Sequence, residues 1–140
     1  MSDKKNRWLM FLRLGAVVAF AMGLLPLLAV LQATQEPWRL FFDFLSWPLD
    51  NVPSDFSATE RQLSAVLGGV LCGWSWILYK LADPKIFSPR IRSLMSQSVW
   101  VWFLLDGTGS VIAGLPLNAI VNIGFLLALI IPLHALKTHQ

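Results

Sequence analysis

Long apolar stretches separated by polar connections dominate the pattern of this chain. Residues 14–31 and residues 62–79 carry no charged side chain, and each stretch approaches the roughly 20 residues that a helix needs to cross a bilayer. Asp106 is the only Asp, Glu, Lys or Arg between residues 93 and 136, and Gly114-Leu115-Pro116 divides that region with a turn signal. The pattern therefore predicts four membrane-spanning helices, at about residues 8–32, 60–81, 94–113 and 116–136.

Composition agrees with a single membrane domain over residues 1–140. Hydrophobic residues make up 56% of the chain and charged residues 14%, whereas soluble domains average about 25% charged residues. The first apolar stretch is longer than the core of a signal peptide and ends at Leu31-Gln32-Ala33 without an Ala-x-Ala pattern, so we expect it to be retained. The predicted fold class is all-α, an integral membrane four-helix bundle with a short interfacial helix in the first extracytoplasmic loop.

Lysine and arginine concentrate at the helix ends that face one side of the predicted membrane. They flank the N-terminal end, the second connection and the C-terminal end, at Lys4, Lys5, Arg7, Arg13, Lys80, Lys85, Arg90, Arg92 and Lys137. Only Arg39 and Arg61 fall on the other side. Because basic residues favour the cytoplasmic side, both termini are predicted to be cytoplasmic, with Arg13 reaching the inner surface. The net charge of +3 then reflects topology, and no nucleic-acid partner is predicted.

The longest connection contains a segment with helical periodicity. Trp38, Phe41, Phe42 and Leu45 recur at helical spacing, which predicts an interfacial helix over residues 37–47. Tryptophan favours the headgroup level, so Trp8, Trp38 and Trp47 are expected to act as interfacial anchors. Alternatively, the segment is a docking face or a lid over a cavity.

The second long helix begins with a capping box, Ser57-Ala58-Thr59-Glu60. Small residues then recur every four positions, at Ala65, Gly69 and Gly73, with Gly68 adjoining them. Such a stripe lets another helix approach closely, either a helix of the same bundle or a helix of a second copy. Two more glycines in the apolar helices, Gly23 and Gly109, are expected to serve helix packing as well.

One polar site is predicted inside the third and fourth spans. Asp106 precedes Gly114 by eight residues and Asn122 follows it by eight, so the two side chains should lie at one depth and hydrogen-bond. Ser110 and Asn118 add polar groups to the same half. Because a charge is costly in lipid, Asp106 should face the bundle interior, either as an ion or small-solute site or as a latch between the helices. The cytoplasmic halves of the first and fourth predicted helices are almost wholly apolar. This predicts a dead-end pocket and not a pore.

Enzyme motifs are not found, and the single Cys72 is expected to be a packing residue, with no metal site predicted. His134 and His139 do not have the spacing of a facing haem-ligand pair. Three functions are weighed. The first is a non-enzymatic accessory or assembly subunit that contacts lipid and other membrane subunits or a second copy. The second is a carrier or binding protein that uses Asp106, Ser110, Asn118 and Asn122.

The third function is a quinol-linked redox subunit. In that case a quinone or pigment would stack on members of a group of four tryptophans, Trp74, Trp76, Trp100 and Trp102. Otherwise these residues are expected to anchor the helices and to fill the bundle. The other two functions require no cofactor.

The Arg13-Leu14-Gly15 entry, Gly23, the segment ERQLSAVLGGVLCGW and a hairpin bearing Asp, Gly and Asn resemble the DoxX-like group of small bacterial membrane proteins. The resemblance covers most of the chain and implies a four-helix bundle in the bacterial cytoplasmic membrane. A few members of that group are linked to quinol or sulfur oxidation. The long aromatic outer loop departs from the pattern.

Overall fold

The computed structural model describes residues 2–46 and 55–139, and every regular element in these residues is helical. The all-α prediction is confirmed for this part of the chain. The α-helices are α1 (Ser2–Leu28), α2 (Glu36–Leu45), α3 (Ala58–Leu81), α4 (Pro89–Ile112) and α5 (Pro116–Ala135). Two short 3-10 helices, η1 (Gln32–Thr34) and η2 (Leu136–His139), follow α1 and α5.

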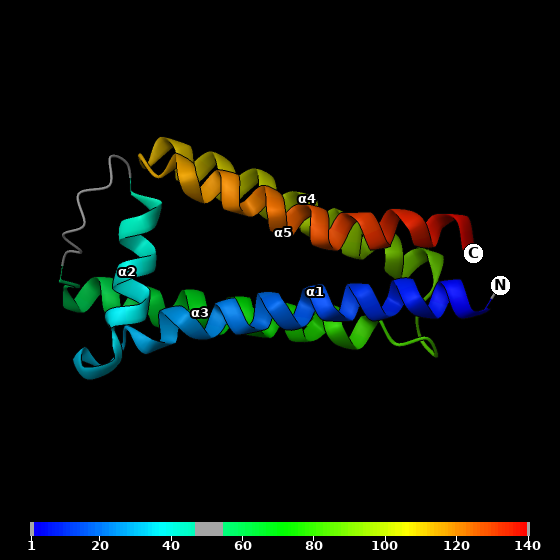
Figure 1. Cartoon of the computed structure of the whole chain (residues 1–140), viewed down its shortest axis with the longest axis horizontal. Helices are drawn as coiled ribbons and strands as arrows, with labels where there is room; N and C mark the ends of the chain where they lie inside the picture. The colour runs from blue at the N-terminus through cyan, green and yellow to red at the C-terminus, as the bar shows by residue number, and fades with distance from the viewer. Residues whose placement is uncertain (1, 47–54, 140) are drawn as a thin grey trace.

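The four long helices form two pairs that diverge toward one end of the molecule (Figure 1). Helix α1 packs along α3, and α4 packs along α5, while contacts between α1 and α5 join the two pairs. Both termini and the connection between α3 and α4 lie at the closed end of the molecule (Figure 1). Helix α2 lies across the opposite end and contacts α1 and α5. We call these the termini end and the α2 end.

Three helices of the described chain are long and apolar enough to cross a membrane: Asp3–Leu28 within α1, Ala58–Leu81 and Pro116–Ala135. Helix α4 has 24 residues but is not among them. Gln97, Asp106 and several serines interrupt its apolar sequence. The structure thus shows three of the four predicted spans by length and composition.

The helix boundaries follow local sequence signals. Ser57 caps α3: its Oγ accepts a hydrogen bond from the Glu60 backbone N–H at 3.3 Å, and its own N–H donates to Glu60 Oε2 at 2.7 Å, which confirms the capping box. Gly114 has φ +80°, a left-handed conformation that favours glycine, and it forms the predicted tight turn before Pro116. Helix α1 ends at Leu28, earlier than the expected residue 32, soon after Pro26.

The hydrophobic core lies at the termini end, where all four long helices meet. Leu12 and Ala16 of α1, Val99 of α4 and Leu129 of α5 are at most 1% exposed. Leu78 and Ala82 bring the α3 side into the same cluster. This end is closely packed, so no space for a ligand remains between the two helix pairs there.

Two glycines make the closest approach between α1 and α3. A Cβ added at Gly68 would lie 2.7 Å from the Gly23 carbonyl oxygen, and one at Gly23 would lie 2.9 Å from Cys72 Sγ. The packing role predicted for Gly23 is therefore confirmed, and Cys72 lies at the same crossing. Gly68 is the matching residue on α3.

Other predicted packing glycines have no such neighbour. A Cβ added at Gly69, Gly73 or Gly109 would meet nothing within 4 Å, so their predicted packing role is wrong within this chain. The contact with α1 is made by the adjoining Gly68 and not by the Gly69 face of α3, and the alternative that this face contacts a second copy stays a prediction. Gly15 was also missed: a Cβ there would lie 3.2 Å from the Ala128 carbonyl oxygen of α5.

Candidate functional site

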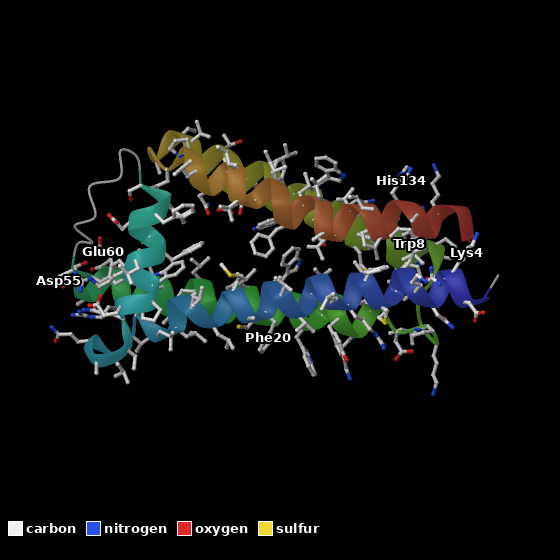
Figure 2. All side chains as sticks on the ribbon, in the orientation of Figure 1. Lys4, Trp8, Phe20, Asp55, Glu60 and His134 are labelled. Carbon is white, nitrogen blue, oxygen red and sulfur yellow. The ribbon has the colours of Figure 1, made fainter. Side chains whose placement is uncertain are left out.

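A cavity of about 470 Å³ lies between the two helix pairs on the α2 side of the core. All five α-helices contribute to its wall, and most of the lining side chains are apolar. Because the pairs diverge toward the α2 end, their facing side chains leave space that the closed end does not have (Figure 2). The predicted pocket in this half of the molecule is therefore present.

One wall of the cavity carries a ladder of polar groups that joins α4 to α5. Asn122 Nδ2 donates to Asp106 Oδ2 at 2.6 Å, and Asn118 Nδ2 donates to Ser110 Oγ at 2.7 Å. Ser110 Oγ in turn donates to the backbone oxygen of Asp106 at 2.7 Å. We call these four residues the polar ladder, and all of them line the cavity.

The register of the α4–α5 hairpin explains why the four residues meet. Asp106 and Asn122 stand at equal distances in sequence from Gly114, and in an antiparallel pair such positions face each other at one level. Ser110 and Asn118 repeat the relation one turn closer to Gly114. The predicted hydrogen bond between Asp106 and Asn122 is confirmed, and the structure adds the second rung.

No basic side chain of the described chain forms an ion pair with Asp106. Arg13 is directed toward the termini end: its Nη2 donates to Asp83 Oδ2 at 3.0 Å, and its guanidinium lies 5.2 Å from the Tyr79 ring centroid. The sequence did not reveal Asp83 as this partner, because it lies in the connection after α3. Asp106 thus has only an amide donor on its carboxylate, which leaves it able to accept a further donor.

Two tryptophans line the cavity where it meets the core. The ring centroids of Trp74 in α3 and Trp102 in α4 lie 5.6 Å apart, and both residues contribute to the cavity wall. Trp76 and Trp100 are instead 54% and 45% exposed, so they face away from the interior. Of the four tryptophans weighed for a ring-shaped ligand, only Trp74 and Trp102 are in a position to contact one in the cavity.

Helix α2 covers the far end of the cavity. Trp38 is 6% exposed, and its indole N–H donates to Ser64 Oγ of α3 at 3.1 Å. Trp38 also stacks on Phe41 with a centroid distance of 5.5 Å, and both rings line the cavity. This position differs from that of a surface anchor and agrees with the alternative interpretation of α2 as a lid.

The other predicted anchors have different outcomes. Trp8 is half-buried and packs against the core cluster, with its ring centroid 5.7 Å from that of Phe11. Trp47 lies outside the described residues, as does the side chain of His139. The role of Trp47 therefore stays a prediction.

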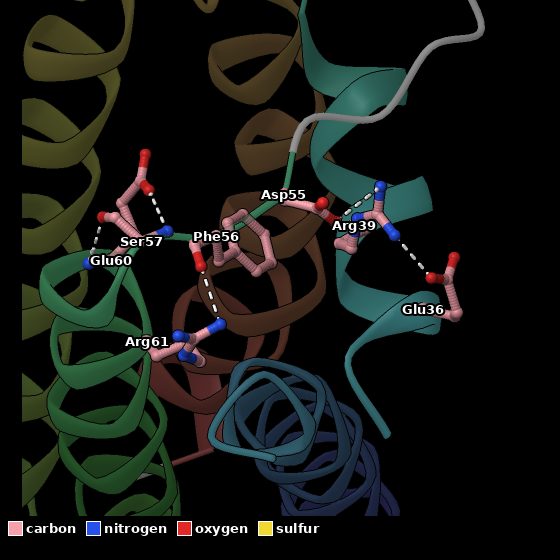
Figure 3. A network of polar contacts seen from close by, with 7 residues as sticks. All are labelled: Glu36, Arg39, Asp55, Phe56, Ser57, Glu60 and Arg61. Atoms are coloured by element: carbon pink, nitrogen blue, oxygen red, sulfur yellow. Dashed lines mark hydrogen bonds and ion pairs between the residues drawn. The ribbon is translucent and has the colours of Figure 1, made fainter. Parts of the chain in front are cut away.

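Ion pairs hold α2 against the segment that leads into α3 (Figure 3). Arg39 pairs with Glu36 of its own helix and, at 3.2 Å, with Asp55. Next to this segment, Arg61 Nη1 donates to the Phe56 backbone oxygen at 2.7 Å. The lid is thus fixed by a buried indole bond on one side and by charges on the other. Its periodicity predicted the helix, but not the partners Ser64 and Asp55.

The cavity is closed toward α1 and α5 and opens between α3 and α4. The wall residues of α1 and α5 are buried or half-buried, with Ala19 and Leu129 at 3% and 1% exposure. Wall residues at the edges of α3 and α4 are exposed, with Leu67 at 49% and Leu105 at 71%. A ligand would therefore enter between α3 and α4, on the α2 side of the Trp74–Trp102 contact.

The described residues contain no group of three or more His, Cys, Asp or Glu side chains arranged to hold a metal ion. Comparisons with protein-family models, with curated proteins and with solved structures find no match for this chain. The site is accordingly defined by its own geometry: a side-opening apolar cavity with one polar wall and a helical lid.

Proposed function

We propose that this chain is an integral membrane protein in which α4 forms the fourth span. Helix α4 lies along α5, and its exposed side chains, such as Leu104, Leu105 and Ile112, are as apolar as those of its neighbours. The polar residues that lower its hydropathy include Asp106 and Ser110, which line the cavity. Polar groups in a membrane helix are expected to turn inward in this way.

The same proposal includes orientation and location. All lysines and arginines except Arg39 and Arg61 belong to segments at the termini end, which the positive-inside rule assigns to the cytoplasm. The α2 end then faces the outside. Kinship with the DoxX-like group would place the protein in a bacterial cytoplasmic membrane.

Within that membrane, we propose that the protein binds one small amphipathic molecule in the cavity. The carrying observation is the cavity of about 470 Å³, apolar on most of its wall and polar only along the ladder that contains Asp106. Ligand pockets typically occupy about 300–1,000 Å³ and combine an apolar lining with a few polar groups that fix orientation. A cavity of this size and character suits binding better than passage of ions, because the closely packed core blocks its inner end.

The polar ladder defines the chemistry of the ligand. Asp106 receives one amide hydrogen bond from Asn122 and has no cationic partner among the described residues, so a ligand amine or hydroxyl supplies a suitable donor. The apolar part of the ligand would lie against Trp74 and Trp102. The proposed ligand class is therefore an amphipathic molecule with one donor group and an apolar body.

A fluorescence titration tests this proposal directly. A nitroxide-labelled alkylamine, added to the full chain in detergent micelles, should quench the tryptophans of the cavity. Asp106→Asn should weaken the affinity obtained from this quenching by about tenfold or more, since a hydrogen bond to a charged group contributes about 1.5–3 kcal/mol. Asp83→Asn, which removes a carboxylate outside the cavity, is the matched control and should bind as the unmodified chain does.

The location of the probe is tested by Trp74→Phe and Trp102→Phe, which should remove most of the quenched signal. A nitroxide-labelled alkane of the same length without the amine should bind Asp106→Asn and the unmodified chain equally. Equal affinity of the alkylamine for these two proteins would reject Asp106 as the ligand-binding group. Trp38 also lines the cavity. Quenching that persists when Trp38, Trp74 and Trp102 are all replaced by Phe would reject the cavity as its site.

A second candidate function, an accessory subunit of a larger complex, has one structural feature in its favour. The face of α3 that carries Gly69 and Gly73 is exposed, and a Cβ at either position would meet nothing within 4 Å. Close approach of a partner helix is possible there. Native mass spectrometry of gently extracted protein distinguishes the candidates, since co-purifying subunits support this role, and a bound small molecule, including a quinone, supports the cavity.

A further inference from the structure

A second recess lies at the termini end, on the seam between α4 and α5, and it is separate from the ligand cavity. It has a volume of about 240 Å³. His134 projects away from the α1–α3 pair in Figure 2, so this seam faces outward from the molecule. The recess is lined by Arg92, Ser96 and Trp100 from α4, and by Ile130, His134 and Lys137 from the C-terminal part.

The lining of this seam changes from charged to apolar with distance from the termini end. On α4, Arg92, Ser96 and Trp100 follow one another at intervals of four residues, so they lie above one another on one helix face. From Arg92 to Trp100 the helix rises about 12 Å, and the lining passes from a cation through a hydroxyl to an aromatic ring. On the antiparallel side, Lys137 lies level with the charged end and Ile130 with the apolar end.

The seam continues beyond Trp100 as an apolar groove of about 410 Å³. The Trp100 and Phe103 rings are in contact, with centroids 6.0 Å apart, and this links the recess to the groove. Gly107 is buried in the groove, and a Cβ added there would meet nothing within 4 Å, so the absence of a side chain leaves room. Leu104 and Ile123 are exposed at 58% and 46% and form its rims.

We propose that this seam binds one anionic phospholipid from the leaflet on the side of the termini. The phosphate lies between Arg92 and Lys137, and one acyl chain runs past Trp100 and Phe103 toward Gly107. Among the described residues, the lining of the two recesses contains two cations and no aspartate or glutamate, and this positive charge complements an anionic headgroup. Basic pockets between membrane helices on the cytoplasmic side bind such headgroups.

The dimensions favour a lipid over a soluble phosphate compound. Arg92 and Gly107 are separated by about 22 Å along α4, whereas the hydrocarbon of one leaflet is about 15 Å thick. The seam therefore accommodates a headgroup and a complete acyl chain. This inference depends on α4 and α5 spanning the membrane and is independent of any ligand at Asp106.

Native mass spectrometry of the full chain tests the site. The protein is released from micelles that contain equal amounts of phosphatidylglycerol and phosphatidylcholine, and the retained lipids are counted. The unmodified chain should retain phosphatidylglycerol preferentially. Replacing both cations, Arg92→Gln with Lys137→Gln, should reduce that preference about 30-fold, at roughly 1 kcal/mol for each basic residue.

The matched control removes two charges from the same end but outside the seam, by Lys85→Gln with Arg90→Gln, and should keep the preference. Equal losses in the two double variants would show a general surface attraction and overturn the site. Asp106→Asn should leave lipid retention unchanged, so failure of the cavity proposal and failure of this one are distinguishable.

Tryptophan quenching by phosphatidylglycerol with brominated acyl chains locates the chain. Trp100→Phe should remove part of the quenching in the unmodified protein but not in the Arg92→Gln/Lys137→Gln variant. Excess inorganic phosphate at constant ionic strength should not displace the lipid. Displacement by phosphate would show that the pocket recognises a free anion, and it would overturn the lipid assignment.

Discussion

The two ends of this molecule are built from the same helices but pack differently. At the termini end, Leu12, Val99 and Leu129 are almost fully buried in one core cluster between the helix pairs. At the α2 end, the pairs diverge around a cavity, and its polar wall is completed by hydrogen bonds between side chains. The comparison teaches that the closely packed core and the interior cavity are assigned to different ends, because a closely packed interior leaves no room for a ligand.

The largest expected effect on stability comes from truncating a buried core side chain at the termini end. Leu12→Ala should lower the free energy of unfolding by about 2–5 kcal/mol, since it removes a fully buried side chain and leaves a void. Leu67→Ala, at the exposed edge of the cavity, should cost clearly less, because this residue is already 49% exposed. Reversible unfolding in mixed detergent micelles measures both. Equal losses would show that the two ends are packed alike.

The next effect separates two adjacent glycines of α3. Gly68→Ala should destabilise the protein by about 1–3 kcal/mol, because its Cβ would lie 2.7 Å from the Gly23 carbonyl oxygen. Gly69→Ala should leave stability unchanged or raise it, since its Cβ meets nothing within 4 Å and alanine favours helices. The same unfolding assay compares them. A greater loss at Gly69 would contradict the α1–α3 crossing at Gly68.

The smallest effect concerns the polar contacts beside the core. The Lys85 backbone N–H, donating at 2.8 Å, and the Arg13 guanidinium lower the pKa of Asp83 below its ordinary value of 3.8. This ionised carboxylate therefore stabilises the folded state at neutral pH, and the contribution is lost as the pH falls through the lowered pKa. The effect is small, because the Asp83 side chain is 40% exposed.

Unfolding of the unmodified chain and of Asp83→Asn, followed from about pH 6 to about pH 3, isolates this contribution. The stability difference between the two proteins should be constant near neutral pH and should shrink in acid. A difference that grows in acid would contradict the direction of the pKa shift.

Much of this arrangement was predictable from the sequence. Apolar stretches and capping signals predicted the helices, and the spacing around Gly114 predicted the contact between Asp106 and Asn122. Those features succeed because they depend on neighbours along the chain or on the register of one hairpin.

Other features were not predictable because they depend on how separate helices meet. The sequence did not distinguish Gly68 from Gly69, since the side of α3 that contacts α1 is set by tertiary packing. It likewise did not pair Arg13 with Asp83, or Trp38 with Ser64, which are far apart in the chain. The cavity itself follows from the divergence of two helix pairs, and no local pattern encodes that angle.

The central claim is that one end is filled and the other is hollow, and two alanines of α1 test it most directly. Ala16 is 0% exposed within the core, and Ala19, at 3% exposure, lines the cavity less than one helical turn away. Ala16→Leu should destabilise the protein by about 1–3 kcal/mol through overpacking, whereas Ala19→Leu should be accepted with little loss because its side chain extends into free space. Equal destabilisation by the two substitutions, measured by unfolding in mixed micelles, would contradict the account.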